Sequence, residues 1–209
     1  MIKISLLKFY LLTFILSISL YSVGNTENEF PLDPAITYGK LENGFTYYIR
    51  ENQTPKNKVS IKLIIKAGSI MEEENQLGLA HLLEHMAFNG SKNFPKRKID
   101  EYMSSIGLNL GSHYNASTGF LETSYVYEIP TRNDKDVEVA LKILTDVSKN
   151  LSLEPEAFER ERKIVEEEWR RDIGGSQNYI NEFHKVLFKN SRFNERKPIG
   201  TLDIIQNFK

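Results

Sequence analysis

Two histidines and a glutamate stand together near the middle of the chain, in the sequence HLLEH at residues 81–85. On a helix, residues four apart lie about 40° apart around the axis, so the imidazoles of His81 and His85 can reach one ion. The Glu84 carboxylate falls about 60° to the other side of His81, where it can meet a metal-bound water without being a ligand. The pattern therefore predicts a metal site that carries its own base. The alternative interpretation is that both histidines pack in a core.

The elements that must position these side chains follow one another as strand and helix patterns. Asn43-Gly44 is typical of a tight turn between two strands. In residues 59–66 apolar and polar side chains alternate, as in a half-buried strand. The other expected elements are helices over residues 76–88, 99–106, 136–149 and 154–171, and a strand over residues 121–129. This grouping predicts the α+β class, with helices on one face of a sheet.

A catalytic zinc site held by two histidines needs a third protein ligand, and residues 154–171 offer two candidates. On the helical wheel of this segment, Glu161 and Glu168 fall within the arc of apolar side chains. Glu154 also falls within this arc, but it lies in the first turn, where the helix N-terminus explains a carboxylate. The other glutamates point away from the arc. A carboxylate on an apolar face is costly unless a positive group meets it. That group is either a metal ion or an arginine or lysine from another element.

Composition excludes several classes of protein. The chain has 209 residues, of which 40% are hydrophobic and 26% charged, and this predicts a globular protein with one core. The formal net charge is -1 and both signs are mixed along the chain, so no nucleic-acid partner is indicated. The chain has no cysteine, which excludes disulfides, thiolate ligands and a cysteine nucleophile. Histidine and carboxylate remain as the strong metal ligands.

The N-terminal segment, residues 1–24, differs in composition from the rest. Two lysines precede an apolar run at residues 9–20, and small residues follow at 22–24, which is typical of a cleaved signal peptide. The run is short for a membrane span, so an uncleaved anchor is the alternative and the only membrane contact we expect. Lipoprotein anchoring is excluded because no cysteine follows. We therefore expect export to the periplasm or the extracellular space, a polar linker over residues 25–34, and one domain over residues 35–209.

Several segments together resemble one known family. These segments are LENGFTYYI (41–49), KAGSI (66–70), GLAHLLEHMAFNG (78–90), NAST (115–118), ERKIVEEEW (161–169) and PIG (198–200). In this order they resemble the N-terminal, metal-bearing domain of the M16 family, which includes pitrilysin, insulin-degrading enzyme and the mitochondrial processing peptidase. The H-x-x-E-H form is itself a zinc peptidase signature. The resemblance implies a LuxS/MPP-like metallohydrolase fold, in which a mostly antiparallel sheet is covered by helices.

The resemblance also assigns a role to each candidate residue. It implies a Zn²⁺ site with three protein ligands, a general base and a supporting carboxylate. The ligands are His81, His85 and Glu168. The general base is Glu84, and the supporting carboxylate is Glu161. The two glutamates that the helical wheel selects are therefore the two that the resemblance requires.

The activity implied is that of a zinc metalloendopeptidase acting on peptides or unfolded polypeptides. Asn115 and Ala116 match the start of an edge strand that pairs with the backbone of a peptide substrate. His113 and His184 match no ligand position. His113 is expected in a loop or strand, and His184 on the face of a helix.

Members of this family close a second homologous half over the zinc domain, in the same chain or as a partner subunit. Since the sequence ends at Lys209, soon after PIG (198–200), we expect a domain incomplete at its C-terminus that needs a second M16 domain or subunit. The alternative is a zinc-binding but inactive fragment or scaffold subunit. S-ribosylhomocysteine lyase shares the fold type and the H-x-x-E-H sequence, but it needs a cysteine near the metal, which this chain lacks.

Overall fold

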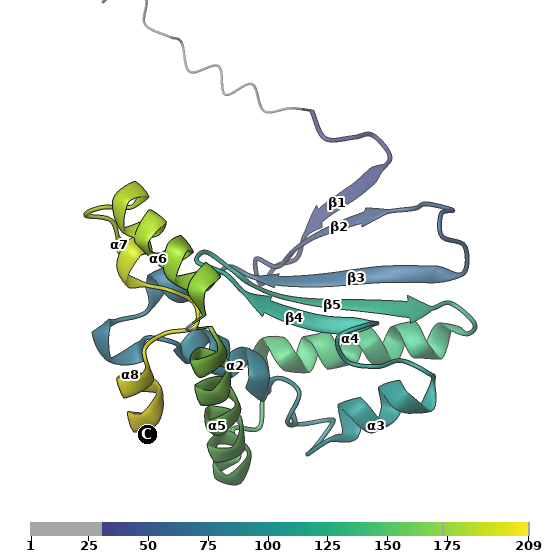
Figure 1. Cartoon of the computed structure of the whole chain (residues 1–209). Helices are drawn as coiled ribbons and strands as arrows, with labels where there is room; N and C mark the ends of the chain where they lie inside the picture. The colour runs from purple at the N-terminus through teal and green to yellow at the C-terminus, as the bar shows by residue number, and fades with distance from the viewer. Residues whose placement is uncertain (1–30, 173, 209) are drawn as a thin grey trace, which may run out of the picture. The chain divides into compact units, whose positions relative to one another are not determined.

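A computed structural model describes residues 31–172 and 174–208 of the chain (Figure 1). The signal peptide expected at residues 1–24 and most of the expected linker lie outside the described residues. The chain divides into two units, residues 1–54 and residues 55–209. Within the described part, no helix combines the length and the apolar character that crossing a membrane would require.

The described part of the first unit is a β-hairpin. Strand β1 (Ile36–Lys40) pairs antiparallel with β2 (Thr46–Arg50), and Tyr38 lies opposite Tyr48 with ring centroids 5.1 Å apart. Gly44 adopts a φ of 87°, a conformation that favours glycine. The hairpin that Asn43-Gly44 predicts is confirmed.

The second unit contains a three-stranded antiparallel sheet in the order β3-β5-β4. Its strands are β3 (Lys58–Ile65), β4 (Tyr114–Thr118) and β5 (Thr123–Pro130). The alternation predicted around residues 59–66 is confirmed, because Leu63 is buried on the same face as the partly buried Val59, Ile61 and Ile65. Among the described residues the only strand that pairs with β4 is β5, and apart from an isolated bridge between Tyr114 and Leu110 the other edge of β4 is open.

One face of this sheet carries the main core. Helix α4 (Asp134–Lys149) lies along β3 and β5, and α3 (Lys98–Ser105) packs into the same cluster (Figure 1). The fully buried members include Ile99, Met103, Tyr127, Ile129, Ala140 and Ile143. Asn133 accepts a hydrogen bond from the amide of Asp136 and so caps the start of α4. Helices on one face of an antiparallel sheet confirm the predicted α+β class.

Helix α2 (Leu79–Met86) carries HLLEH and begins later than predicted. The expected start at residue 76 is wrong because Glu74–Gln76 forms a separate 3-10 turn (η2), which follows another, η1 (Ser69–Met71). Gly78 then takes a φ of 97° and lies against Gly200, whose own φ is 73°. A Cβ on Gly200 would overlap the carbonyl oxygen of Leu77, so only glycine fits there.

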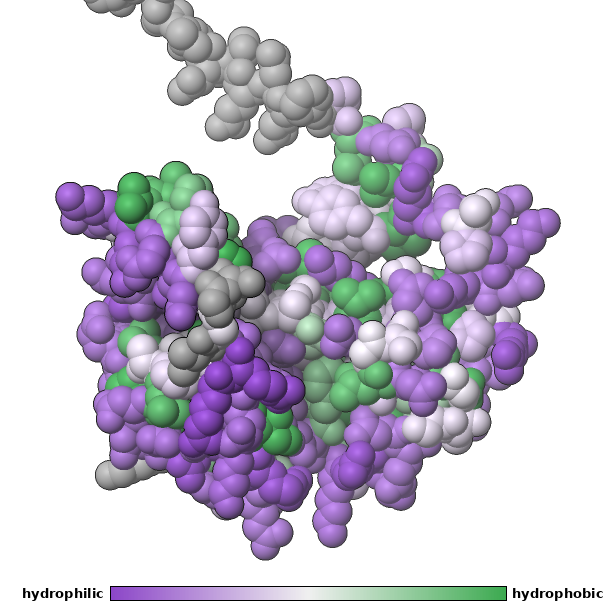
Figure 2. All heavy atoms as spheres, in the orientation of Figure 1, coloured by the Kyte–Doolittle hydropathy of each residue, from purple (hydrophilic) through white to green (hydrophobic). Residues whose placement is uncertain are grey.

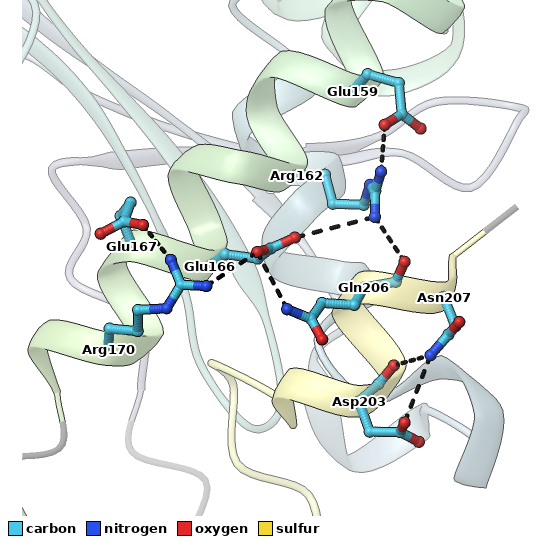
Figure 3. Close-up of polar contacts among 8 residues, drawn as sticks. All are labelled: Glu159, Arg162, Glu166, Glu167, Arg170, Asp203, Gln206 and Asn207. Carbon is cyan, nitrogen blue, oxygen red and sulfur yellow. Dashed lines mark hydrogen bonds and ion pairs between the residues drawn. The ribbon is translucent and has the colours of Figure 1, made fainter.

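Helix α5 (Pro155–Arg171) crosses α2, and the short helix α8 (Leu202–Asn207) packs beside it. Leu82, Val165 and Ile205 from these three helices are fully buried together. On the outer side of α5, Arg162 pairs with Glu159 and Glu166 and donates to the carbonyl of Gln206 on α8 (Figure 3). The glutamates that the wheel turned away from the apolar arc therefore meet arginines here.

The remaining helices of the second unit are α6 (Gly175–Leu187) and α7 (Arg192–Glu195). The segment after α6 is fastened to the 3-10 turns that precede α2. Ser69 Oγ donates to the carbonyl of Arg196 over 2.6 Å, and Arg192 and Arg196 both donate to the carbonyl of Glu72 over 2.8 Å. Residues 192–196 are therefore held against residues 69–72, which precede the helix that carries HLLEH.

Candidate metal centre

His81 and His85 lie on one face of α2, one turn apart. Their ring centroids are 4.8 Å apart and the rings stand at 89° to one another. Each side chain is 17% exposed, whereas Leu82 and Met86 on the opposite face are fully buried. Since both imidazoles border a cavity, packing of the two histidines in a core does not describe this structure.

Glu168 of α5 meets both histidines. Its Oε2 lies 3.6 Å from His81 Nε2 and 3.5 Å from His85 Nε2. One atom from each of the three residues falls within 4.8 Å of the others, a cluster that could hold a metal ion. No arginine or lysine among the described residues pairs with Glu168, so the side chains that meet this carboxylate are the two imidazoles.

The donor set fits zinc. Ligand atoms about 2.0–2.1 Å from a tetrahedral zinc are separated by about 3.3–3.4 Å, close to the separations of Glu168 Oε2 from the two Nε2 atoms. Two imidazoles and one carboxylate, without a thiolate, form a donor set found in catalytic zinc sites, which keep a fourth position open.

Glu161 lies behind His85, one heptad before Glu168 on α5. Because its carboxylate can only accept, His85 Nδ1 must donate across their 3.1 Å contact, so in the neutral ring Nε2 is unprotonated and faces Glu168. Asn89 Nδ2 donates to the other oxygen of Glu161 over 2.8 Å. Burial acts to raise the pKa of Glu161, but these hydrogen bonds outweigh it and the pKa lies below its usual range.

The two histidines differ electrostatically. Burial lowers the pKa of His81 to about 4, and the neighbouring His85 adds to the effect. Burial also acts to lower the pKa of His85, but the hydrogen bond to Glu161 and the charge of Glu168 outweigh it and raise the pKa. His81 Nδ1 is buried and has no hydrogen-bond partner among the described residues. His81 is therefore neutral at ordinary pH, and in the tautomer with the proton on Nδ1 it offers a lone pair from Nε2.

Glu84 lies next to this cluster and is almost fully buried. Thr118 Oγ1, at the end of β4, donates to Glu84 Oε2 over 2.6 Å. Burial raises the pKa of Glu84, and the hydrogen bond from Thr118 opposes that effect. Glu84 is not among the clustered ligand atoms, so its carboxylate is free to exchange a proton.

The other sequence candidates lie along β4 and beyond. Asn115 and Ala116 are on the open edge strand, and Ala116 borders the same cavities as His81 and Glu84. His113 precedes β4, and its Nδ1 accepts from the amide of Asn109, away from the cluster. His184, on α6, lines the larger cavity but does not belong to the cluster.

Three further residues support the site and were not singled out from the sequence. Thr118 holds Glu84, Asn89 holds Glu161, and Glu72 accepts from the amides of Gly78 and Ala80 at the start of α2. Only Asn89 left a local signal, since it follows His85 by four residues and so lies on the same helical face. Thr118 and Glu72 reach the site through contacts distant in sequence.

Comparison with known proteins places this site in context. A family model described as insulinase, peptidase family M16, matches residues 47–194. The probable zinc protease PqqL of Haemophilus influenzae is 38% identical over 179 residues, covering 86% of this chain and 19% of that protein. The zinc protease PQQL-like of Arabidopsis thaliana is 32% identical over 185 residues, covering 88% and 19%. The crystal structure of the periplasmic protease PqqL from Escherichia coli has a TM-score of 0.83 at 34% identity, covering 86% of this chain and 20% of that one.

The fold is that of the M16 proteases, and the relatives reported above are named as zinc proteases. The chain belongs to the insulinase family, peptidase family M16. The resemblance inferred from the sequence and the fold it implied are therefore confirmed. The chain spans about a fifth of the length of the curated relatives it matches.

Proposed function

We propose that this chain is the zinc-bearing part of a metalloendopeptidase that hydrolyses peptide bonds in peptides or unfolded polypeptides. The observation that carries the proposal is the convergence of His81 Nε2, His85 Nε2 and Glu168 Oε2, with the Glu84 carboxylate beside them and a cavity in front. His81, His85 and Glu168 would hold the metal. When bound, zinc would supply Lewis-acid polarisation of the peptide carbonyl and lower the pKa of a water in its open position.

Glu84 would move the protons of the reaction. As a carboxylate it takes a proton from the attacking water, and as an acid it returns a proton to the leaving amine. Burial raises its pKa, and the hydrogen bond that Thr118 donates to Oε2 favours the ionised form. Glu161 would act through His85, because its hydrogen bond fixes the tautomer and orientation of that ring.

The open edge of β4 would position the substrate. Its free backbone groups can add a further strand by β-augmentation, and Asn115 and Ala116 lie where that strand would pass His81 and Glu84. Backbone pairing is independent of side chains, which suits substrates that vary in sequence.

The surface of α6 supports the proposal that further polypeptide of an M16 assembly completes this unit. The helix exposes an apolar face, and Figure 2 shows hydrophobic atoms over this part of the surface. Its members are Tyr179, Ile180, Phe183, Val186 and Leu187. Val186 is 79% exposed, and a helix face of this kind is stable in water only when covered. We propose that a second M16 domain or subunit provides the cover.

Exchange of amide hydrogens tests this docking face. In residues 25–209 mixed with the separately expressed remainder of the Haemophilus influenzae PqqL relative, α6 should exchange more slowly than in the chain alone. Val186→Glu should abolish the protection, whereas Lys142→Glu on exposed α4 should not. Binding without protection of α6 would place the interface elsewhere.

We also propose that the protein acts outside the cytoplasm, in the periplasm or beyond. The composition of residues 1–24 supports export, and the Escherichia coli relative is described as periplasmic. A fusion of residues 1–24 to a reporter active only after export should be active.

Metal analysis and a peptide assay on residues 25–209 test the central proposal. The stripped chain should bind about one equivalent of zinc and then cleave an internally quenched peptide in a chelator-sensitive reaction. Zinc binding without cleavage, even after addition of the PqqL remainder, would favour the inactive scaffold. Failure to bind zinc would overturn both the peptidase proposal and the inactive-scaffold alternative.

A further inference from the structure

The larger cavity of the second unit starts at the metal centre and extends away from it. Its volume is about 710 Å³, and His81 and Glu84 form its inner wall. Residues 116–118 of β4 form one side, and α6 with residues 194–201 forms the far side. A peptide laid along β4 would therefore place a side chain next to the scissile bond in this cavity.

The part of the far wall that α6 forms is polar. Asn178, Asn181 and His184 of α6 line the cavity at intervals of three residues, while the apolar side chains of the same helix face outward. The rest of the lining includes the apolar side chains of Phe120, Trp169 and Ile199. On the side of α6, the cavity therefore favours a ligand group that forms hydrogen bonds or carries charge.

Lys197 brings a cation to this wall. Its Nζ donates to Asn181 Oδ1 over 2.8 Å, and the side chain is partly buried. Among the described residues Lys197 forms no ion pair, although Asp172 and Glu195 line the same cavity. Glu182 pairs with Lys185 at 2.5 Å, Glu195 lies 3.7 Å from Arg196, and Asp172 is exposed.

A partly buried ammonium without a counter-ion is costly to keep charged. Burial lowers the pKa of Lys197, repulsion by Lys185 adds to the effect, and the charge of Glu182 opposes it without cancelling it. A neutral amide partner leaves most of this cost in place, and a carboxylate that entered the cavity would offset it. A lysine with a purely structural role would gain more stabilisation from an ion pair with one of the nearby glutamates.

We propose that Lys197 is a specificity-determining residue that binds a carboxylate of the substrate in this cavity. The inference rests on the proposed peptidase function and names its substrate class: peptides with an aspartate or glutamate flanking the scissile bond, or with a free C-terminal carboxylate close to it. Asn181 orients the ammonium, and His184 adds a second donor on the same wall. The two sources of the carboxylate present the same group to Lys197.

Peptide binding to the zinc-loaded Glu84→Gln chain tests the inference without turnover. Matched peptides carry Glu, Gln or Lys on either side of the cleavable bond, and each is made with a free and an amidated C-terminus. The Glu peptides should bind about fivefold more tightly than the Gln peptides, as expected for a partly exposed ion pair. A preference that follows the free C-terminus instead would assign the terminal carboxylate as the ligand.

Variants of Lys197 connect any preference to this residue. Lys197→Met should abolish the preference, Lys197→Glu should reverse it toward Lys, and Lys197→Arg should keep it. Lys163→Met, at an exposed position on α5, should change nothing. Unfolding midpoints of all variants show whether each is folded, and Lys197→Arg supplies the comparison if Lys197→Met is not.

The outcomes separate the inference from the proposed function. Equal binding of Glu and Gln peptides, or no binding of any peptide at millimolar concentration, would overturn the role of Lys197. Cleavage of peptides by the wild-type chain without a charge preference would leave the peptidase function intact. A charge preference in binding, together with no cleavage by any zinc-loaded form, would support the role of Lys197 and overturn the peptidase function.

Discussion

The hydroxyl of Thr118 donates to Glu84 Oε2 over 2.6 Å and so joins the open edge strand β4 to helix α2. The strand proposed to hold the substrate therefore also holds the proposed base. Any shift of β4 relative to α2 would change the position of the substrate and the ionisation of Glu84 together.

Substitution of Glu84 separates metal binding from catalysis. In Glu84→Gln the zinc content should remain about one equivalent, while kcat falls by about 10²- to 10⁴-fold because the amide cannot accept the proton of the attacking water. Zinc analysis and a quenched-peptide assay measure both. Retained cleavage would remove Glu84 from the role of base.

Substitution of Thr118 tests the ionisation of the base. Thr118→Val removes the donor that lowers the pKa of Glu84, while burial still raises it, so the pKa should rise. Since the base must be ionised, the acidic limb of kcat/KM should move to higher pH. Activity below neutral pH should fall several-fold and recover as the pH rises. Thr145→Val on α4 should leave the profile unchanged, and an unmoved limb in Thr118→Val would contradict the prediction.

Glu168 and Glu161 should differ in their effect on zinc. Glu168→Ala removes a ligand and should abolish stoichiometric binding. Glu161→Gln removes only the acceptor for His85 Nδ1 and should weaken zinc binding by about 10- to 100-fold. Competition with a chelator of known affinity measures both, with Glu167→Gln at the exposed neighbouring position as the control. Equal effects of the two variants would show that Glu161 is itself a ligand.

Asp146 predicts a pH-dependent contribution to stability that is independent of the metal. It is fully buried and accepts hydrogen bonds from Ser91, Asn93 and Asn150. Burial acts to raise its pKa, but these bonds outweigh it and the pKa lies below the usual value. Its stabilisation is therefore present above the unfolded pKa and is lost as the pH falls through the folded pKa.

Urea unfolding of Asp146→Asn tests this sign. At neutral pH the variant should lose about 1–3 kcal/mol of unfolding free energy, because buried donors lose a charged acceptor. The difference from wild type should shrink as the pH falls through the folded pKa of Asp146. Glu138→Gln, exposed on the same helix, should cost little at any pH. A difference in unfolding free energy that stays constant with pH would show that the charge of Asp146 does not stabilise the folded state.

The part of the site that the sequence predicts is the part set by helical geometry. Spacing alone predicts His81 beside His85, and the wheel of α5 singles out Glu161 and Glu168, which in the structure lie against the imidazoles. The wheel could not say what meets these carboxylates, because that depends on where α5 crosses α2. Two candidates were left open, and the structure brings imidazoles rather than an arginine or lysine to Glu168.

Features set by contacts distant in sequence were not predictable in this way. The start of α2 depends on Glu72 and on the approach of Gly200, neither of which appears in the hydrophobic pattern of residues 76–88. The contact of Thr118 with Glu84 depends on the register of β4, where Tyr114 pairs with Tyr127. His184 has ordinary helical spacing and gives no sign that it lines a cavity.

The interlocked glycines at 78 and 200 have a consequence for engineering. Gly200 lies three residues after Lys197, and Gly78 lies three residues before His81, so the cavity wall and the first histidine share one backbone junction. Insertions or deletions in residues 197–200 should disturb zinc affinity as well as substrate choice. Selectivity should therefore be redesigned by exchanging side chains at Asn178, Asn181 and Lys197 on an unaltered backbone.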